Sequence, residues 1–377
     1  MDLRAKVHLI NFLRKMAVNA VFFLVPLYLL KNGFNGWEIG AAVSLYALTP
    51  LLVTFPTGWI NDRLAISGVV RGALAVIALV LAALANTRTF LPTALLFAVF
   101  GAANAMLDTS LNSLYYKDRR QTDLNRKFGV YSFWMNFGTA VGTLLGGLLV
   151  FLSGFQALFY ALAGLMVLTI LFVRHFGDEK FEFVSLGEYR RAFVHRKALL
   201  LAAMLFVLAL HWGLEGTVYS PFLREAFGLN SLELSLYISG ALFATALASY
   251  RVSRMRFDQA SNQRLFLAGM LMSGAGLALM TLPNVYLSFL ARVLHETGDG
   301  MMAVVIIVFI SRLFERRNIG GNAGLLQAIF TLGHVAGAQI FSPMGYSLGL
   351  RVPFIVAGAI LVLDCAFAYI VFRKLSY

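Results

Sequence analysis

The sequence predicts an all-α membrane protein with twelve transmembrane helices in two parallel, pseudo-symmetric six-helix bundles. Three observations predict this fold class: a composition that is 59% hydrophobic and 13% charged, a succession of apolar stretches of helical length, and an internal repeat. A hydrocarbon core about 30 Å thick requires about 20 apolar residues per helix. Soluble domains contain about 25% charged residues, so the composition excludes that class of protein.

The expected spans follow one another with short connections. They cover residues 7–30, 37–60, 69–86, 90–115, 127–152, 155–174, 198–223, 232–251, 264–282, 284–313, 320–345 and 350–373. The uncharged stretch 128–173 is long enough for two spans, and Ser153-Gly154 is the expected turn between them. No small-residue cleavage site follows the first apolar run, so we predict an uncleaved first span rather than a signal peptide.

Positive charge is concentrated on one side of the predicted membrane. With the N-terminus in the cytoplasm, the inner regions hold 26 of the 31 Lys and Arg residues, the outer loops hold four, and Arg292 lies inside a span. Cytoplasmic loops of membrane proteins carry such an excess. The net charge of +13 therefore indicates topology, with both termini cytoplasmic, and not nucleic-acid binding. The single cysteine, Cys365, excludes a disulfide framework and a cysteine-based metal site.

A shift of 195 residues aligns landmarks in the two halves of the chain. The aligned pairs are Pro26 with Pro221, Gly33 with Gly228, Asn35 with Asn230, Glu38 with Glu233, Gly129 with Gly324, Gly138 with Gly333 and Gly142 with Gly337. Matched glycines and prolines indicate shared backbone requirements. We therefore predict an N-terminal bundle over 1–174, a cytoplasmic linker over 175–197 and a C-terminal bundle over 198–377. Parallel halves are typical of transporters, with the site where the halves meet.

Two motifs carry a family resemblance. Span 2 ends in Gly58-Trp-Ile-Asn-Asp62-Arg63, with Arg71 eight residues further on, and span 5 carries Gly129, Gly138, Gly142-Thr143 and Gly146-Gly147. In these motifs the sequence resembles the major facilitator superfamily, with its Gly-x-x-x-Asp-Arg/Lys loop after span 2 and its glycine-rich antiporter motif in span 5. The resemblance covers the whole chain. It implies an alternating-access secondary transporter, and we expect the bacterial inner-membrane type.

Both motifs also predict conformational roles on physical grounds. Asp62 at a helix end can face the positive N-terminus of another helix and pair with loop arginines, which predicts an inner gate. Glycines at i, i+4 and i+8 form a smooth helix face that permits close approach and sliding. The predicted gating residues are Gly58, Asp62, Arg63, Arg71, Gly138, Gly142 and Gly146. For both motifs, simple packing is the alternative interpretation.

The ionisable residues within the spans cluster on three helices. Seven of nine lie on spans 4, 7 and 10, and the other two are His334 and Asp364. Because a charge in hydrocarbon is costly, this distribution predicts a polar pathway. In the resembled fold, helices 1, 4, 7 and 10 line the cavity. The predicted substrate and proton pathway comprises Asn19, Asn104, Asp108, His211, Glu215, Arg292, His295, Glu296 and Asp299. Whether Arg14 or Lys15 enters the cavity stays open.

We predict proton-coupled transport. Burial favours a protonated Glu296 and the cation of Arg292, one turn away, opposes it, so this carboxyl group can switch as its surroundings change. A static ion pair is the alternative. The acidic excess favours cationic or zwitterionic substrates slightly, and nearby aromatic residues suit amphiphiles. Thr143 replaces the proline of the antiporter motif and Phe97 an arginine of many proton antiporters, so export is only slightly favoured over import.

Other function classes remain as alternatives. A proton-coupled importer of a small metabolite or siderophore-like solute is one, and a transport-derived sensor or a channel is another. An intramembrane protease is disfavoured, because Glu296 occupies the first glycine position of Gly-x-Gly-Asp and no Tyr-Asp pair occurs. We predict no enzyme activity, no catalytic residue, no metal site and no cofactor. The expected partners are a small molecule, protons and the lipid bilayer, with no nucleic acid, for a monomeric protein; the coupling ion, H⁺ or Na⁺, stays open.

Overall fold

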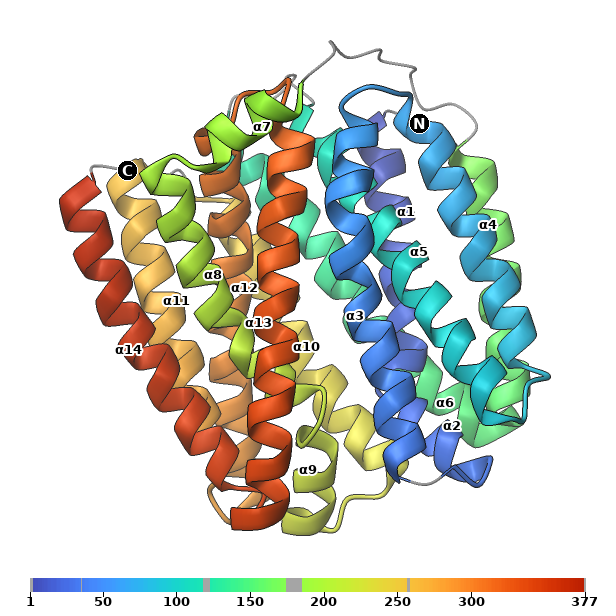
Figure 1. The fold of residues 1–377 in the computed structure, drawn as a ribbon. Helices are drawn as coiled ribbons and strands as arrows, with labels where there is room; N and C mark the ends of the chain where they lie inside the picture. Colours follow the sequence, from blue (N-terminus) through green and yellow to red (C-terminus); the bar gives the residue numbers. More distant parts are fainter. Residues whose placement is uncertain (1–2, 35, 118–122, 174–184, 256–257, 376–377) are drawn as a thin grey trace. The chain divides into compact units, whose positions relative to one another are not determined.

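The computed structural model describes residues 1–377 except 1–2, 35, 118–122, 174–184, 256–257 and 376–377. The described residues form fourteen helices and no strand (Figure 1). The helices are α1 (Leu3–Phe22), α2 (Val25–Lys31), α3 (Gly36–Asn61), α4 (Ile66–Leu84), α5 (Phe90–Lys117), α6 (Leu124–Val173), α7 (Leu186–Phe193), α8 (Arg196–Glu215), α9 (Tyr219–Phe227), α10 (Ser231–Ser253), α11 (Gln259–Leu279), α12 (Val285–Leu313), α13 (Ile319–Leu348) and α14 (Val352–Leu375).

Nine of the described helices are long and apolar enough to cross a membrane. One of them, α6, contains the two predicted spans 127–152 and 155–174 and breaks at Gly154, where φ is +79°. This left-handed conformation favours glycine, and it confirms the predicted turn. The remaining two predicted spans correspond to α11 and to α1, which carries four basic residues. The predicted all-helical membrane protein is therefore confirmed.

The predicted first and seventh spans each contain a break. Span 7–30 divides into α1 and α2, and span 198–223 into α8 and α9. Pro26 and Pro221 lie within the first turn of α2 and α9, where the missing N–H of proline does no harm. Gly33 and Gly228 follow these two short helices with φ of +81° and +67°. Both pairs are 195 residues apart, so the repeat is present in the backbone.

The internal contacts divide the chain into two compact units. Unit 1 comprises Met1–Arg119, Val141–Ala192 and Phe314–Thr331. Unit 2 comprises Arg120–Ala140, Phe193–Leu313 and Leu332–Tyr377. Two of the boundaries between the units fall inside α6 and α13, and each unit contains segments from both halves of the sequence. The predicted bundle boundaries at 174 and 198 stay a prediction, and residues 175–184 of the predicted linker lie outside the described residues.

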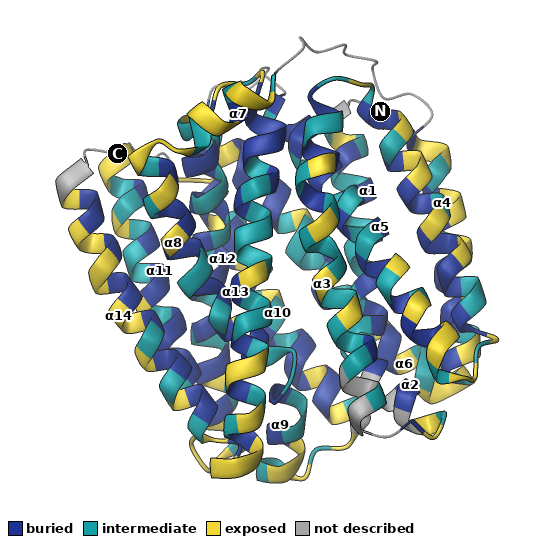
Figure 2. Ribbon diagram, in the orientation of Figure 1, coloured by how far each residue is buried: buried dark blue, intermediate teal, exposed yellow. Residues whose placement is uncertain are grey.

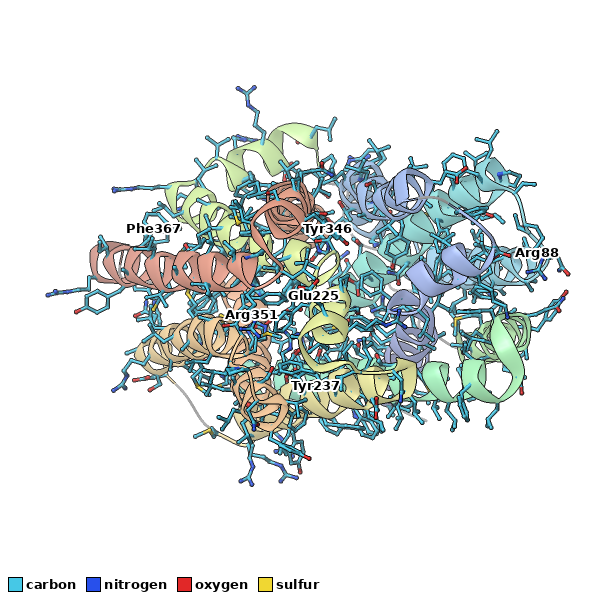
Figure 3. The ribbon with its side chains drawn as sticks, turned by 90° about the horizontal axis from the view of Figure 1, so that it is seen from below. Arg88, Glu225, Tyr237, Tyr346, Arg351 and Phe367 are labelled. Carbon is cyan, nitrogen blue, oxygen red and sulfur yellow. The ribbon has the colours of Figure 1, made fainter. Side chains whose placement is uncertain are left out.

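Within each unit, long helices pack directly on one another. In unit 1, α5 packs on α3 and α4, and in unit 2, α11 lies between α12 and α14, while α10 packs on α12 (Figure 1). Apolar side chains are exposed along α4 and α14, where Leu79 and Leu363 are each 70% exposed (Figure 2). Phe367, labelled in Figure 3, belongs to the same exposed apolar side of α14. Apolar surface of this extent is suited to contact with lipid chains.

Glycines allow the backbone of the first helix of each repeat, α1 or α8, to pack closely against a second helix, α6 or α13. In unit 1, a Cβ on Gly142 or Gly146 of α6 would collide with backbone atoms of Met16 or Ala20 in α1. In unit 2, a Cβ on Gly333 or Gly337 of α13 would collide with the backbone of Phe206 or Leu210 in α8. Gly142 and Gly337 are 195 residues apart, so the same contact occurs twice. Small residues permit this close approach of helix backbones.

A methyl group added at Gly142 should therefore destabilise the protein. We expect Gly142→Ala to lower the midpoint of thermal unfolding in detergent, because overpacking against a backbone costs about 1–3 kcal/mol. Gly164→Ala is the matched control on the same helix, since a Cβ there meets no atom within 4 Å. It should leave the midpoint unchanged or raise it, because alanine favours a helix over glycine by about 1 kcal/mol. Equal effects of the two substitutions would contradict the close contact.

Candidate functional site

Six ionisable side chains of unit 2 form one connected group between α8 and α12, here called the α8–α12 network. Its members are His211, Glu215, Arg292, His295, Glu296 and Asp299. Each helix contributes pairs four residues apart, which places them on one helical face. Arg292, His295, Glu296 and Asp299 are at most 8% exposed. The predicted face of span 10 is thus directed at the predicted face of span 7, as the spacing indicated.

Arg292 occupies one end of the α8–α12 network. Its guanidinium donates one hydrogen bond to Glu215 and another, at a distance of 2.5 Å, to Oε1 of Glu296. The same guanidinium lies 4.4 Å from the centre of the Tyr219 ring. The other oxygen of Glu296 accepts from the Thr245 hydroxyl of α10 at 2.5 Å. Charge-assisted hydrogen bonds of this kind are the strong ones in proteins. Both oxygens of Glu296 are therefore bound, one to Arg292 and the other to Thr245.

The histidines occupy the other end. Asp299 accepts from the Ser273 hydroxyl at 2.7 Å and from the Trp212 indole N–H at 2.9 Å. The Nε2 atoms of His211 and His295 lie 3.2 Å and 3.8 Å from Oδ2 of Asp299, and Nε2 of His295 lies 2.9 Å from Oε1 of Glu215. These contacts link two carboxylates, those of Asp299 and Glu215, through two imidazoles. Such a chain can hold protons at several alternative positions.

A second polar group lies in unit 1, between α1 and α5. Arg14 is fully buried and donates to Asp108 at 2.6 Å, to Asn11 at 2.8 Å and to Asn104 at 3.0 Å. Asn104 also donates to the Tyr46 hydroxyl at 3.3 Å. Of the two adjacent basic residues, Arg14 is the one that forms the ion pair with Asp108. Asn19 donates to the carbonyl of Lys15 at 2.9 Å on the same helix.

A third group surrounds Asp62 at the end of α3, also within unit 1. The carboxylate lies 2.6 Å from the ammonium of Lys117 and accepts from the backbone N–H groups of Gly320 (3.2 Å) and Gly321 (2.8 Å). The two glycines begin α13, so Asp62 faces the positive end of a helix as predicted. It also accepts from the hydroxyl of Tyr189 at 2.8 Å. Four donors thus converge on one buried carboxylate.

Tyr189 was not predicted as part of this group. It lies on α7, is 1% exposed, and its ring covers Gly321. Burial and the adjacent Asp62 carboxylate raise the pKa of the Tyr189 phenol, which therefore stays a hydrogen-bond donor at neutral pH. The polar segment between the bundles was expected to be a linker only. Here it supplies a side chain that covers the contact between α3 and α13.

The predicted arginine partners of Asp62 do not contact it in the described structure, and Lys117 takes their place. The guanidinium of Arg63 lies 3.7 Å above the Trp59 ring, an arrangement favourable for a cation, and Arg71 is exposed on α4. Gly58 packs on the backbone of Gly320 and Gly321. Among the span-5 glycines, Gly142 and Gly146 contact α1, and Gly138 is buried.

A family model now decides the class of the protein. The model described as Major Facilitator Superfamily matches residues 7–257 and 201–376. The chain belongs to the major facilitator superfamily. It is therefore a secondary transporter embedded in a membrane and not an enzyme.

Comparison with individual proteins supports the fold of this chain and nothing further. A search of curated proteins found no match to this facilitator. Among solved structures, the crystal structure of the human organic anion transporter MFSD10 (TETRAN) is similar, with a TM-score of 0.83 and 15% sequence identity. The similarity covers 98% of this facilitator and 100% of that chain. The predicted fold is confirmed, whereas identity at this level carries no information on the substrate.

Proposed function

We propose that this facilitator is a proton-coupled secondary active transporter of a small molecule. Protons would move through Glu296 or Asp299, and the substrate would contact Asp108 or Glu215. The observation that carries the proposal is the α8–α12 network, a buried group of three carboxylates, two imidazoles and one guanidinium. Ionisable groups inside a membrane are costly, and they typically mark substrate or proton pathways.

The proposed coupling follows from the shared partners of Arg292. Its guanidinium binds both Glu215 and Glu296, so a movement of α8 against α12 that breaks one contact leaves a buried carboxylate with less compensation. An uncompensated buried carboxylate takes up a proton rather than remain charged. A substrate cation that binds Glu215 would compete with Arg292 in the same way. Proton uptake and substrate binding are thereby linked through one side chain.

The direction and the substrate class are supported by weaker observations. The span-5 glycines favour export slightly, and a proton-coupled importer of a small metabolite or siderophore-like solute is the alternative. The acidic excess of the α8–α12 network favours a cationic or zwitterionic substrate. The excess of Lys and Arg in alternate loops supports cytoplasmic termini in a bacterial inner membrane, and we propose a monomer. A sensor or a channel of the same fold is the candidate from another class.

The test begins with a ligand screen by thermal shift on the purified protein, repeated at two pH values. A ligand that raises the unfolding temperature is then assayed in proteoliposomes. We expect uphill accumulation when a pH gradient is imposed, and none when the gradient is abolished by a protonophore. Accumulation that follows a Na⁺ gradient instead would contradict proton coupling. Binding without flux would indicate a sensor, and flux far above carrier rates would indicate a channel.

A further inference from the structure

We propose that the α8–α12 network binds one divalent transition-metal cation of the Zn²⁺ class. The ligands are His211, His295 and Asp299, with Glu215 as the fourth. This inference deepens the proposed function, because it names a ligand class for the same side chains. No local sequence motif points to such a site, and the sequence analysis predicted none, since the ligands come from two helices about 80 residues apart.

The four ligands come from two equivalent pairs. His211 and Glu215 on α8, and His295 and Asp299 on α12, each combine a histidine with a carboxylate four residues later. The pairs meet crosswise, because Nε2 of His211 faces Asp299 and Nε2 of His295 faces Glu215. Side chains on facing helices at such spacing form the metal sites of helical bundles. Two nitrogens and two oxygens suit Zn²⁺ and disfavour Mg²⁺ and Ca²⁺, which prefer oxygen ligands alone.

Three measured separations between ligand atoms are close to those around a tetrahedral ion. Zn²⁺ bound at about 2.0–2.2 Å places neighbouring ligand atoms about 3.4 Å apart. The measured separations are 3.2 Å from His211 Nε2 to Asp299 Oδ2, 3.8 Å from His295 Nε2 to the same oxygen, and 2.9 Å from His295 Nε2 to Glu215 Oε1. The ligand atoms of His211, His295 and Asp299 all lie within 4.8 Å of one another.

The hydrogen bonds behind the histidines direct both Nε2 atoms at the proposed ion. Nδ1 of His211 lies 2.5 Å from the carbonyl of Leu208, and Nδ1 of His295 lies 2.8 Å from the carbonyl of Ser273. A carbonyl only accepts, so each Nδ1 carries a hydrogen, and in the neutral ring Nε2 carries a lone pair. His295 is fully buried, and its Nε2 has no well-oriented hydrogen-bond partner among the described residues. Histidines that bind metals are held in this manner.

The charges of the network leave room for a divalent cation. The cation of Arg292 is balanced by Glu296, whose second oxygen is satisfied by Thr245. Glu215 and Asp299 remain, with two negative charges facing two imidazoles. The other titratable groups nearby are Tyr219, on which Arg292 stacks, and His334 on α13. One Zn²⁺ would neutralise these two negative charges.

The test uses full-length protein in detergent, with any histidine tag removed, and Zn²⁺ itself as the probe. Calorimetric titration should give one Zn²⁺ per wild-type chain and no response to Mg²⁺. The affinity for Zn²⁺ should decrease as the pH is lowered, and about two protons should be released per bound ion at acidic pH. His211→Gln combined with His295→Gln should weaken binding about 100-fold or more, and Asp299→Asn should also weaken it. His334→Gln is the matched control and should bind as the wild type does.

A second measurement does not depend on variants that fold. X-ray absorption at the zinc edge of the wild-type complex should show two imidazoles with the remaining ligands oxygen, at about 2.0–2.2 Å. Binding that survives the double histidine substitution, or a spectrum without imidazole, would overturn the inference. Its failure is distinguishable from failure of the proposed function. If the wild type binds Zn²⁺ and the variants Glu296→Gln and Asp299→Asn keep pH-driven accumulation, the proton path alone is refuted. If the wild type does not bind Zn²⁺ and both variants lose accumulation, the metal site alone is refuted.

Discussion

Neutralising Glu296 or Asp299 should abolish uphill transport while sparing exchange. We expect Glu296→Gln and Asp299→Asn each to lower pH-driven accumulation in proteoliposomes by about 100-fold or more, which is the typical contribution of a proton-transferring group. Both variants keep the size of the side chain, so Thr245 and Ser273 retain a hydrogen-bond partner. A carrier that no longer needs to release a proton can still exchange substrate across the membrane. Counterflow of labelled substrate should therefore persist.

The matched control is Asp364→Asn. Asp364 is also a buried carboxylate in unit 2, but it lies on α14 and has no contact with the α8–α12 network in the described structure. Its neutral variant should accumulate substrate at the wild-type rate. The pH dependence of substrate binding should flatten in Glu296→Gln or Asp299→Asn and not in Asp364→Asn. Wild-type accumulation in both network variants would make the network structural, and coupling would move to Asp108 or Glu215 or be replaced by uniport.

The helices and the α8–α12 network could be anticipated because each follows from short-range periodicity. A span needs only a run of apolar residues, and spacings of three, four and seven place Arg292, His295, Glu296 and Asp299 on one face. The cost of burying charge then makes a facing polar helix the expected partner. The matched prolines Pro26 and Pro221 indicated a shared backbone requirement in the first and seventh spans, but not the residues at which the helices break. Apolar flanking residues on both sides of each proline concealed the interruption.

The partners of these groups could not be predicted, because they depend on tertiary packing. Ser273 and Thr245 are small polar residues in apolar spans, and many such residues bond only to their own helix carbonyls. Lys117 was counted with the inner-loop cations, and nothing in the sequence shows that the end of α5 is buried. Tyr189 is one aromatic residue in a polar segment. The choice between Arg14 and Lys15 likewise required the structure, since adjacent residues differ by about 100° around a helix.

Asp62→Asn should separate the end of α3 from the start of α13. The amide keeps the size of the carboxylate but loses its charge, and its NH₂ group would meet donors at Gly320, Gly321 or Tyr189. Lys117, which is fully buried, would lose its anionic partner at Asp62 and keep the carbonyl of Asn61 as an acceptor at 2.6 Å. Removing one partner of a buried ion pair costs about 3–5 kcal/mol. In the proposed topology this opens the carrier toward the cytoplasm.

Thiol labelling can measure this opening. Ser113 is 1% exposed beside Gly320, so Ser113→Cys in a Cys365→Ser background places the only thiol under the contact. We expect a water-soluble maleimide to label it at least about tenfold faster when Asp62→Asn is added. Losing about 3–5 kcal/mol of stabilisation at this contact would allow an increase in labelling rate larger than about tenfold. Other contacts that also keep Ser113→Cys covered would make the observed increase smaller.

Two further substitutions separate charge from packing at the same place. Lys117→Met added to Asp62→Asn removes the cation that has lost its carboxylate, so labelling should return part of the way toward the parent rate. The double-mutant cycle measures the coupling between the two residues. Tyr189→Phe removes one hydrogen bond to a charged acceptor, worth about 1.5–3 kcal/mol, and should give a smaller increase than Asp62→Asn. Because the phenol stays protonated at neutral pH, its contribution should not change between pH 6 and 8, a range that brackets neutrality. Labelling that is the same in parent and Asp62→Asn proteins would leave Asp62 as a packing residue with no gating role.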